Sequence, residues 1–359
     1  MGIEVSAAEL LRLRQFTQRI HPAGTGSVVE TVRHLLAIQA QDFAQSLWAV
    51  GLRTHGSSRS DVLASLERGE VVRTLPMRGT LHFVAAEDLR WMLAVTAARS
   101  LQSAATRFEQ LGLDSATLDQ AESVTRRELA GGSLSRDEFM KLLSLNGISP
   151  EGQRGYHVIF YLTQLSLICW GPPSGTQQAL VLIDDWIPAQ QTLSKDEALA
   201  QFARRYFASH GPATERDFAW WTKLTLMDAR TGMTAARDAL TELTHKGTSH
   251  WIATSELDAA SDIRAASAVH VLPGFDEYLL GYQDRLLPLA AEHSERIVPG
   301  GNGIFLPTII AKGRVVGTWR RVPRSKTAQI EPEHFETANA AQHGSFAKAA
   351  KGYARFANG

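Results

Sequence analysis

The stretch SSRSDVLASLERGEVVRTLPMRGTLHFV, residues 57–84, joins a helix to a β-hairpin. Its opening serines and the aspartate that follows are typical of a helix N-terminus, and Gly69 is typical of the residue that ends a helix. Two runs rich in β-branched residues come next, on either side of a polar turn at Met77–Gly79. A helix-turn-helix that leads into such a hairpin is the winged-helix pattern.

Two further stretches open in the same way. SLSRDEFMKLLSLNG starts at Ser133, and PATERDFAWWTKLTLMDA starts at Pro212. A long helix beginning GQRGYHVIF and a hairpin in GPPSGTQQALVLIDDW are expected after the second stretch. After the third, we expect a helix over TAARDALTELTH, residues 234–245, and a β-rich run in HKGTSHWIAT. The sequence therefore predicts three winged-helix modules in tandem.

The last hundred residues have a different character, with many glycine, β-branched and aromatic residues. AKGRVVGTW predicts a hairpin that turns at Lys312–Gly313, and we expect a small β-barrel-like region around it. FETANAAQHGSFAKAAKGYARFA predicts a closing amphipathic helix. The fold class is α+β, with predicted domains at residues 1–130, 131–192, 193–260 and 261–359.

Composition limits the class of protein. The chain has 359 residues, is 44% hydrophobic and has a formal net charge of zero, which argues against a chain-wide electrostatic grip on nucleic acid. It has no apolar run of membrane-spanning length and no secretory leader, so we expect a cytoplasmic protein, and we expect a monomer. Its one cysteine, Cys169, excludes an internal disulfide and lies in an apolar run, so we expect a buried thiol. No common metal, nucleotide or hydrolase motif occurs, and we expect no metal and no cofactor.

Basic residues gather near the C-terminus. Residues 301–327 contain six basic and no acidic residues, whereas residues 254–300 contain eight acidic and three basic ones. This basic strip is either a face that follows a phosphate backbone or ordinary solvated charge. It comprises Lys312, Arg314, Arg320, Arg321, Arg324 and Lys326.

Three glutamines stand close together in LLAIQAQDFAQSLW, residues 35–48. Gln39 and Gln41 cannot share a helix face, because residues two apart lie about 200° apart around a helix. If the preceding helix ends near Ile38, the segment can be extended, and both amides then project to one side with Ala40 behind them. The alternative is a polar turn in water, which composition alone favours. Asp42 is expected to cap the next helix.

The combination of several stretches carries a family resemblance. LLAIQAQDFAQSLWAVGLRT, MRGTLHFV, LPGFDEYLLGYQDR and GRVVGTW resemble the tandem winged-helix DNA glycosylases of the AlkZ/YcaQ type. The resemblance spans nearly the whole chain and implies three winged-helix units and a β-barrel-like part that form a C-shaped clamp around duplex DNA. It also implies that Gln39 and Gln41 are the catalytic residues, in the Gln-apolar-Gln branch. That branch includes self-resistance enzymes that excise purines alkylated at N7 and unhook interstrand crosslinks.

Winged helices usually place a helix in a groove and the wing on the backbone. Arg73 and Arg78 flank the first wing and are expected to contact DNA, as is the basic strip. His82 faces away from the apolar side of its strand, so it either points into the groove or is a satisfied structural histidine.

Two neutral amides suffice for this chemistry. A purine alkylated at N7 is already cationic, so it departs as a neutral base, and the enzyme has only to stabilise an oxocarbenium-like sugar and aim a water at C1′. A glutamine carbonyl oxygen accepts a hydrogen bond from water. We assign the positioning of the water to Gln41 and the orientation of the substrate to Gln39. Two other classes remain open: a non-catalytic DNA-binding regulator, and a protein that sequesters a drug without DNA.

Overall fold

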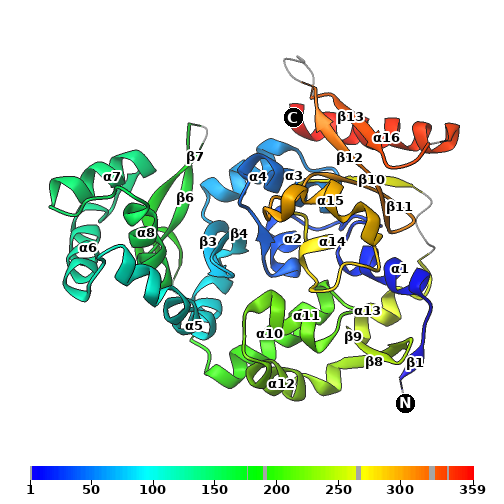
Figure 1. The fold of residues 1–359 in the computed structure, drawn as a ribbon, viewed down its shortest axis with the longest axis horizontal. Helices are drawn as coiled ribbons and strands as arrows, with labels where there is room; N and C mark the ends of the chain where they lie inside the picture. The colour runs from blue at the N-terminus through cyan, green and yellow to red at the C-terminus, as the bar shows by residue number, and fades with distance from the viewer. Residues whose placement is uncertain (1, 176, 189–191, 264–267, 323–327, 338) are drawn as a thin grey trace.

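The computed structural model describes the chain except for residues 1, 176, 189–191, 264–267, 323–327 and 338. The strands of the described residues form a six-stranded, a four-stranded and a three-stranded sheet, surrounded by helices (Figure 1). Helices and strands are thus mixed throughout, as the α+β prediction requires. None of the described helices is both long enough and apolar enough to cross a membrane.

A β-α-α-β-β unit occupies the first part of the chain after α1 (Ala7–Thr17) and α2 (Val28–Leu35). Its elements are β2 (Ile38–Gln39), α3 (Phe43–Arg53), α4 (Arg59–Glu67), β3 (Val71–Met77) and β4 (Thr80–Ala85). The short first strand pairs with the last strand, antiparallel. The predicted helix and hairpin are confirmed, with a capping box between Ser58 and Asp61 and positive φ at both Arg78 and Gly79 in the turn.

The same order recurs in a second unit, at the left of Figure 1. It contains β5 (Ser133–Leu134), α7 (Arg136–Leu145), α8 (Arg154–Gln164), β6 (Ile168–Ser174) and β7 (Gln177–Leu182), and β5 pairs with β7. Strand β3 pairs with β6 through Arg73 and Trp170, so the two hairpins join in one sheet of order β2-β4-β3-β6-β7-β5. Cys169 lies in this sheet and is fully buried as predicted, and its burial raises the pKa of the thiol to about 12.

Two helices connect these units: α5 (Leu89–Gln110) and α6 (Ser115–Glu128). Leu118 and Ala121 of α6 share a hydrophobic core with Phe139 of α7 and Val158 of α8. Residues before the predicted boundary at 130 therefore pack with the second unit. After that unit, the short α9 (Ile183–Trp186) leads towards α10 (Lys195–Ser209).

The third unit repeats the order a last time. It contains α11 (Glu215–Thr222), α12 (Leu226–Ala235), β8 (Leu240–His245) and β9 (Thr248–Ala253), and a bridge from Ala213 to Trp251 takes the place of the first strand. The predicted helix over 234–245 is wrong, because residues 240–245 form a strand. β8 lies between β9 and the N-terminal β1 (Ile3–Glu4), and these tertiary pairings outweigh the local helical pattern.

The C-terminal part forms an open antiparallel sheet. Its order is β10 (Val269–Leu272), β11 (Thr308–Ala311), β12 (Arg314–Arg321) and β13 (Ile330–His334), so among the described strands β10 and β13 are edges and no barrel closes. This corrects the β-barrel-like prediction. The closing helix, α16 (Ala340–Asn358), is confirmed, and its Phe346, Tyr353 and Phe356 pack in one core with the sheet.

Three further short α-helices occur among the described residues of the last part of the chain. They are α13 (Thr254–Ala259), α14 (Glu277–Leu280) and α15 (Ser294–Ile297). Trp48 of α3 donates its indole N–H to the carbonyl of Val271 in β10 at 2.8 Å, and it packs against Tyr353 of α16. The C-terminal sheet is therefore docked directly on the first unit, behind the glutamine segment.

Candidate active site

The Gln39-Ala40-Gln41 segment is extended at its start, as the spacing of its amides predicts. Helix α2 stops at Leu36, whose φ of 65° breaks the helical path. Gln39 then pairs with His82 of β4, and the amide of Ala40 donates to the carbonyl of Leu81 at 2.7 Å. Ala40 is fully buried in one core with Ile38, so the alanine packs behind the glutamines.

A buried arginine holds the carbonyl groups of the segment. Arg73 donates from Nε and Nη2 to the carbonyl of Ala40 at 2.9 and 2.7 Å, and from Nη2 to the carbonyl of Gln41 at 3.3 Å. Its side chain stands over the ring of Phe43, and burial lowers the pKa of the guanidinium to about 10. Arg73 is 4% exposed, so it is placed to shape the segment, and this burial argues against a direct phosphate contact.

A buried carboxylate holds the other side of the segment. The backbone N–H of Gln39 donates to Glu277 Oε1 at 2.9 Å, and the indole N–H of Trp221 donates to Glu277 Oε2 at 2.8 Å. Glu277 belongs to α14 and Trp221 to α11, so one carboxylate joins the first unit, the third unit and the C-terminal part. Burial alone would raise the pKa of Glu277, but the contact with His210 and the charge of Arg78 lower the pKa to about 2.

The two glutamine side chains lie at different depths. Gln39 is 8% exposed, and its Oε1 lies 3.4 Å from Arg78 Nη2. Gln41 is exposed, and its Oε1 accepts the backbone N–H of Leu81 at 3.3 Å. A carbonyl oxygen has two lone pairs, so the Gln41 oxygen can accept one further hydrogen bond from water. Asp42 caps α3 through the N–H of Gln45 at 3.1 Å, which confirms the predicted cap.

Arg78 and His82 form the inner wall of the site. Arg78 donates from Nη1 to the carbonyl of Leu280 at 3.0 Å, and its Nη2 lies 2.9 Å from His82 Nε2. The Nδ1 of His82 lies 2.8 Å from the carbonyl of Thr80, and burial lowers the pKa of the imidazole to about 3. A neutral ring that donates from Nδ1 and accepts at Nε2 satisfies both contacts. His82 is fully buried, which agrees with the structural histidine rather than one that points into a groove.

The chain resembles known proteins over most of its length. The sequence model of the family described as DNA glycosylase AlkZ-like matches residues 32–356. The chain belongs to the AlkZ-like DNA glycosylase family. A relative from Streptomyces sahachiroi, named interstrand DNA cross-link repair glycosylase, is 25% identical over 343 residues, which cover 92% of each chain.

The solved structure of Streptomyces sahachiroi DNA glycosylase AlkZ has the same fold. It aligns with a TM-score of 0.83 at 24% identity and covers 99% of this chain and 97% of its own. The AlkZ-like chain therefore keeps the full-length architecture of that structure, including the C-terminal sheet and α16.

The structure describes only part of the predicted basic strip of this AlkZ-like chain. Lys312, Arg314, Arg320 and Arg321 are exposed, and Arg320 Nη2 lies 3.1 Å from Glu331. The predicted turn at Lys312–Gly313 is confirmed, but its glycine is packed down: Tyr278 donates to the carbonyl of Gly313 at 2.7 Å, and a Cβ there would lie 2.7 Å from that of Leu11. Arg324 and Lys326 lie outside the described residues.

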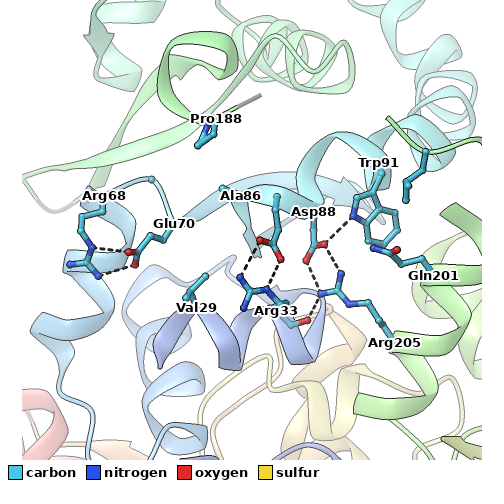
Figure 2. Close-up of a pocket in the computed structure, with 13 residues that line it drawn as sticks. Val29, Arg33, Arg68, Glu70, Ala86, Asp88, Trp91, Pro188, Gln201 and Arg205 are labelled. Atoms are coloured by element: carbon cyan, nitrogen blue, oxygen red, sulfur yellow. Dashed lines mark hydrogen bonds and ion pairs between the residues drawn. The ribbon is translucent and has the colours of Figure 1, made fainter. Parts of the chain in front are cut away.

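The cavity in Figure 2 is a different place from the glutamine segment. It has a volume of about 680 Å³ and lies among α2, the start of α5 and α10. Its arginines are satisfied by neighbouring carboxylates (Figure 2), in the pairs Arg33–Glu87, Arg68–Glu70 and Arg205–Asp88. Neither glutamine lines it, so the candidate site of this AlkZ-like chain is a surface segment rather than this cavity.

Sequence reasoning singled out the two glutamines but missed the carboxylate that binds the backbone of Gln39. The stretch LPGFDEYLLGYQDR, which contains Asp276 and Glu277, contributed only to the family resemblance. Asp276 caps α14, and both its oxygens bind the buried Arg53 at 2.7 and 2.8 Å. The signal for Glu277 was an acid inside an otherwise apolar run, because acids are rarely buried without partners.

Proposed function

We propose that this chain is a monofunctional DNA glycosylase that hydrolyses the N-glycosidic bond of bases alkylated at purine N7. The observation that carries the proposal is the way in which the backbone of the glutamine segment is held. Arg73, Glu277 and Leu81 together bind its backbone, while the amide of Gln41 stays exposed. A segment fixed from behind with an exposed polar side chain in front is suited to positioning a water.

The reaction assigns one task to each glutamine. As the bond between C1′ and N9 breaks, the positively charged N7-alkylpurine leaves as a neutral base, and the sugar becomes an oxocarbenium-like cation. Gln41 accepts a hydrogen bond from the water that attacks C1′, and the new C1′ hydroxyl loses its extra proton to bulk water. Gln39, held against Arg78, orients the sugar and adds a negative carbonyl dipole near the developing cation.

An exposed catalytic residue also suits large adducts. A flipped base needs a tight pocket, whereas Gln41 stands on an open surface. The name of the Streptomyces relative concerns interstrand crosslinks. We therefore extend the proposal to bulky and crosslinked N7 adducts, as in repair or antibiotic self-resistance.

For the binding mode, we propose three winged-helix modules in a C-shaped clamp around duplex DNA. The support is the order β-α-α-β-β, which occurs three times within the described residues, each time with the first strand or bridge paired to the last strand. We propose that the exposed cations of the C-terminal strip contact phosphates from the other side of the duplex. These cations are Lys312, Arg314, Arg320 and Arg321.

The test is to incubate the protein with duplexes that carry one N7-methylguanine, one N7 interstrand crosslink, or no lesion, and to measure abasic sites by mild alkaline cleavage. We expect abasic sites in the first two duplexes and none in the third. Borohydride should trap no protein–DNA adduct, because a water and not an amine attacks C1′. DNA binding without abasic sites would instead indicate a regulator, and neither binding nor excision would indicate a protein with another ligand.

A further inference from the structure

A second cavity differs from the others in its charge. It has a volume of about 430 Å³ and lies where the three units meet: against the Arg78–Gly79 turn, one face of α5, the start of α8 and the loop between α11 and α12. Arg78, Arg99, Arg107 and Lys223 line it together with His157 and Ser103, and no carboxylate lines it. The cavity in Figure 2, by contrast, contains three acidic residues.

Arg78 lies 4.0 Å from the carboxylate of Glu277, whereas the other three cations of this basic pocket have no acidic partner within ion-pair distance among the described residues. Arg99 and Lys223 form no ion pair within the described part of the chain, and Arg107 bonds only to the neutral amides of Gln110 and Gln153, at 3.1 and 2.9 Å. A concave surface lined by one sign of charge concentrates the electrostatic potential and attracts anions. The pocket is therefore built for a negatively charged ligand.

Two of these cations have positive backbone φ angles, which favour glycine or asparagine over arginine or lysine. Arg78 has a φ of 57°, and Lys223, which ends α11, has a φ of 60°. Glycine and asparagine adopt this left-handed region with least strain, because the Cβ of other residues approaches the backbone closely there. Such strain is commonly found at functional sites, which supports a role for the charges themselves.

The pocket and the glutamine segment lie on two sides of one turn. Arg78 lines the pocket, and its Nη2 is 3.4 Å from Gln39 Oε1. Tyr156 of α8 donates to the carbonyl of Gly79 at 3.3 Å and so ties the second unit to the same turn. An anion in the pocket would therefore be held in a fixed relation to the catalytic glutamines.

We propose that this basic pocket binds phosphates of the DNA backbone next to the damaged nucleotide. The inference rests on the proposed glycosylase function for the identity of the anion, because duplex DNA supplies phosphates beside every base. Arg99, Arg107 and Lys223 bind the phosphates, and Arg78 passes the register of the bound strand to Gln39. The role is one of binding and positioning, separate from the attack of water.

The test compares two triple variants that each lose three positive charges. The pocket variant is Arg99→Ala, Arg107→Ala and Lys223→Ala. The control removes the exposed cations of α16, a helix far from α5 and α8 in Figure 1: Lys348→Ala, Lys351→Ala and Arg355→Ala. Affinity for an undamaged duplex is measured by fluorescence anisotropy across a range of NaCl concentrations.

We expect the pocket variant to lower the slope of log K against log[NaCl] by about two to three, because each lost phosphate contact contributes about 0.9. The α16 variant should keep the wild-type slope. Equal slopes in the pocket variant and the wild type, or equal losses in both variants, would overturn the proposal. If the pocket variant does not fold, the single changes Arg99→Gln and Lys223→Gln are measured, and each should lower the slope by about one.

A scan with neutral methylphosphonates locates the contact. One phosphate at a time is replaced around an N7-methylguanine, and wild-type affinity should fall at one to three positions beside the lesion. The pocket variant should be insensitive at those same positions, and sensitivity there equal to that of the wild type would refute the assignment. Abasic sites are scored separately with the wild type, so a failure of the glycosylase proposal is distinguishable from a failure of the pocket.

Discussion

Replacing Glu277 with glutamine tests the inner support of the site. The carboxylate accepts from Gln39 N–H at 2.9 Å and from Trp221 Nε1 at 2.8 Å, one donor on each oxygen. An amide has only one oxygen, so one of these buried donors is left facing an NH₂ group, at a cost of about 1–3 kcal/mol. Arg78, whose Nη2 lies 4.0 Å from Glu277, also loses its opposite charge. We expect Glu277→Gln to reduce the free energy of unfolding by about 3–5 kcal/mol in total.

The effect has a defined pH dependence. The pKa of Glu277 is about 2 in the folded chain, and an unfolded glutamate has a pKa of about 4.3. A lowered pKa stabilises the fold above the unfolded pKa, and this contribution, about 3 kcal/mol, is lost as the pH falls from about 4.5 to about 2. The glutamine variant has no such group. The stability difference between wild type and variant should therefore be largest at neutral pH and narrow towards pH 2.

Urea unfolding followed by tryptophan fluorescence at several pH values measures this difference. Glu122→Gln is the matched control, because Glu122 pairs with Arg126 on the surface of α6 and such pairs contribute at most about 1 kcal/mol. In the folded Glu277→Gln protein, we expect excision at saturating DNA to slow by about tenfold or more, since the segment loses one of its anchors. A variant as stable as the wild type would refute the reasoning, and so would a stability difference that does not change with pH.

Two further predictions concern the cations. Arg73→Lys cannot reproduce the forked donation to the carbonyl of Ala40, so we expect a loss of about 2–4 kcal/mol in stability and slower excision at saturating DNA, with an unchanged salt slope; a lower slope with normal excision would make Arg73 a phosphate contact instead. Arg320→Ala with Arg321→Ala should weaken duplex binding and lower the salt slope by up to about two, as measured by anisotropy. An unaltered slope would remove both residues from the interface.

Local features of this fold could be predicted from the sequence. The cap at Asp42, the turn at Met77–Gly79 and the end of the helix at Gly69 depend on residues within a few positions of one another. The spacing of Gln39 and Gln41 allowed an extended segment, but composition alone favoured a polar turn, and the family resemblance was needed to prefer the extended form. The spacing could not predict how deeply each side chain is buried: Gln39 is buried, whereas Gln41 is exposed.

Features that depend on distant segments could not be predicted. Glu277 is 238 residues from Gln39, and no local pattern links the two. The helical pattern over 234–245 failed because residues 240–245 pair with β9 and β1. The barrel failed for a similar reason: strand patterns do not show whether a sheet closes, and here α16 packs against the open sheet. The inward hydrogen bonds of Arg73 to the glutamine segment could not be foreseen either, because they join residues more than thirty positions apart.

The central claim is that Gln41 positions the attacking water, and Gln41→Ala tests it most directly. The measurement is single-turnover release of N7-methylguanine from a duplex at saturating enzyme, with thermal unfolding and duplex affinity measured in parallel. We predict a rate about a hundredfold or more below that of the wild type, with both other quantities unchanged, because Gln41 is exposed and supports neither the core nor the pocket. A rate within a few-fold of the wild type would contradict the account.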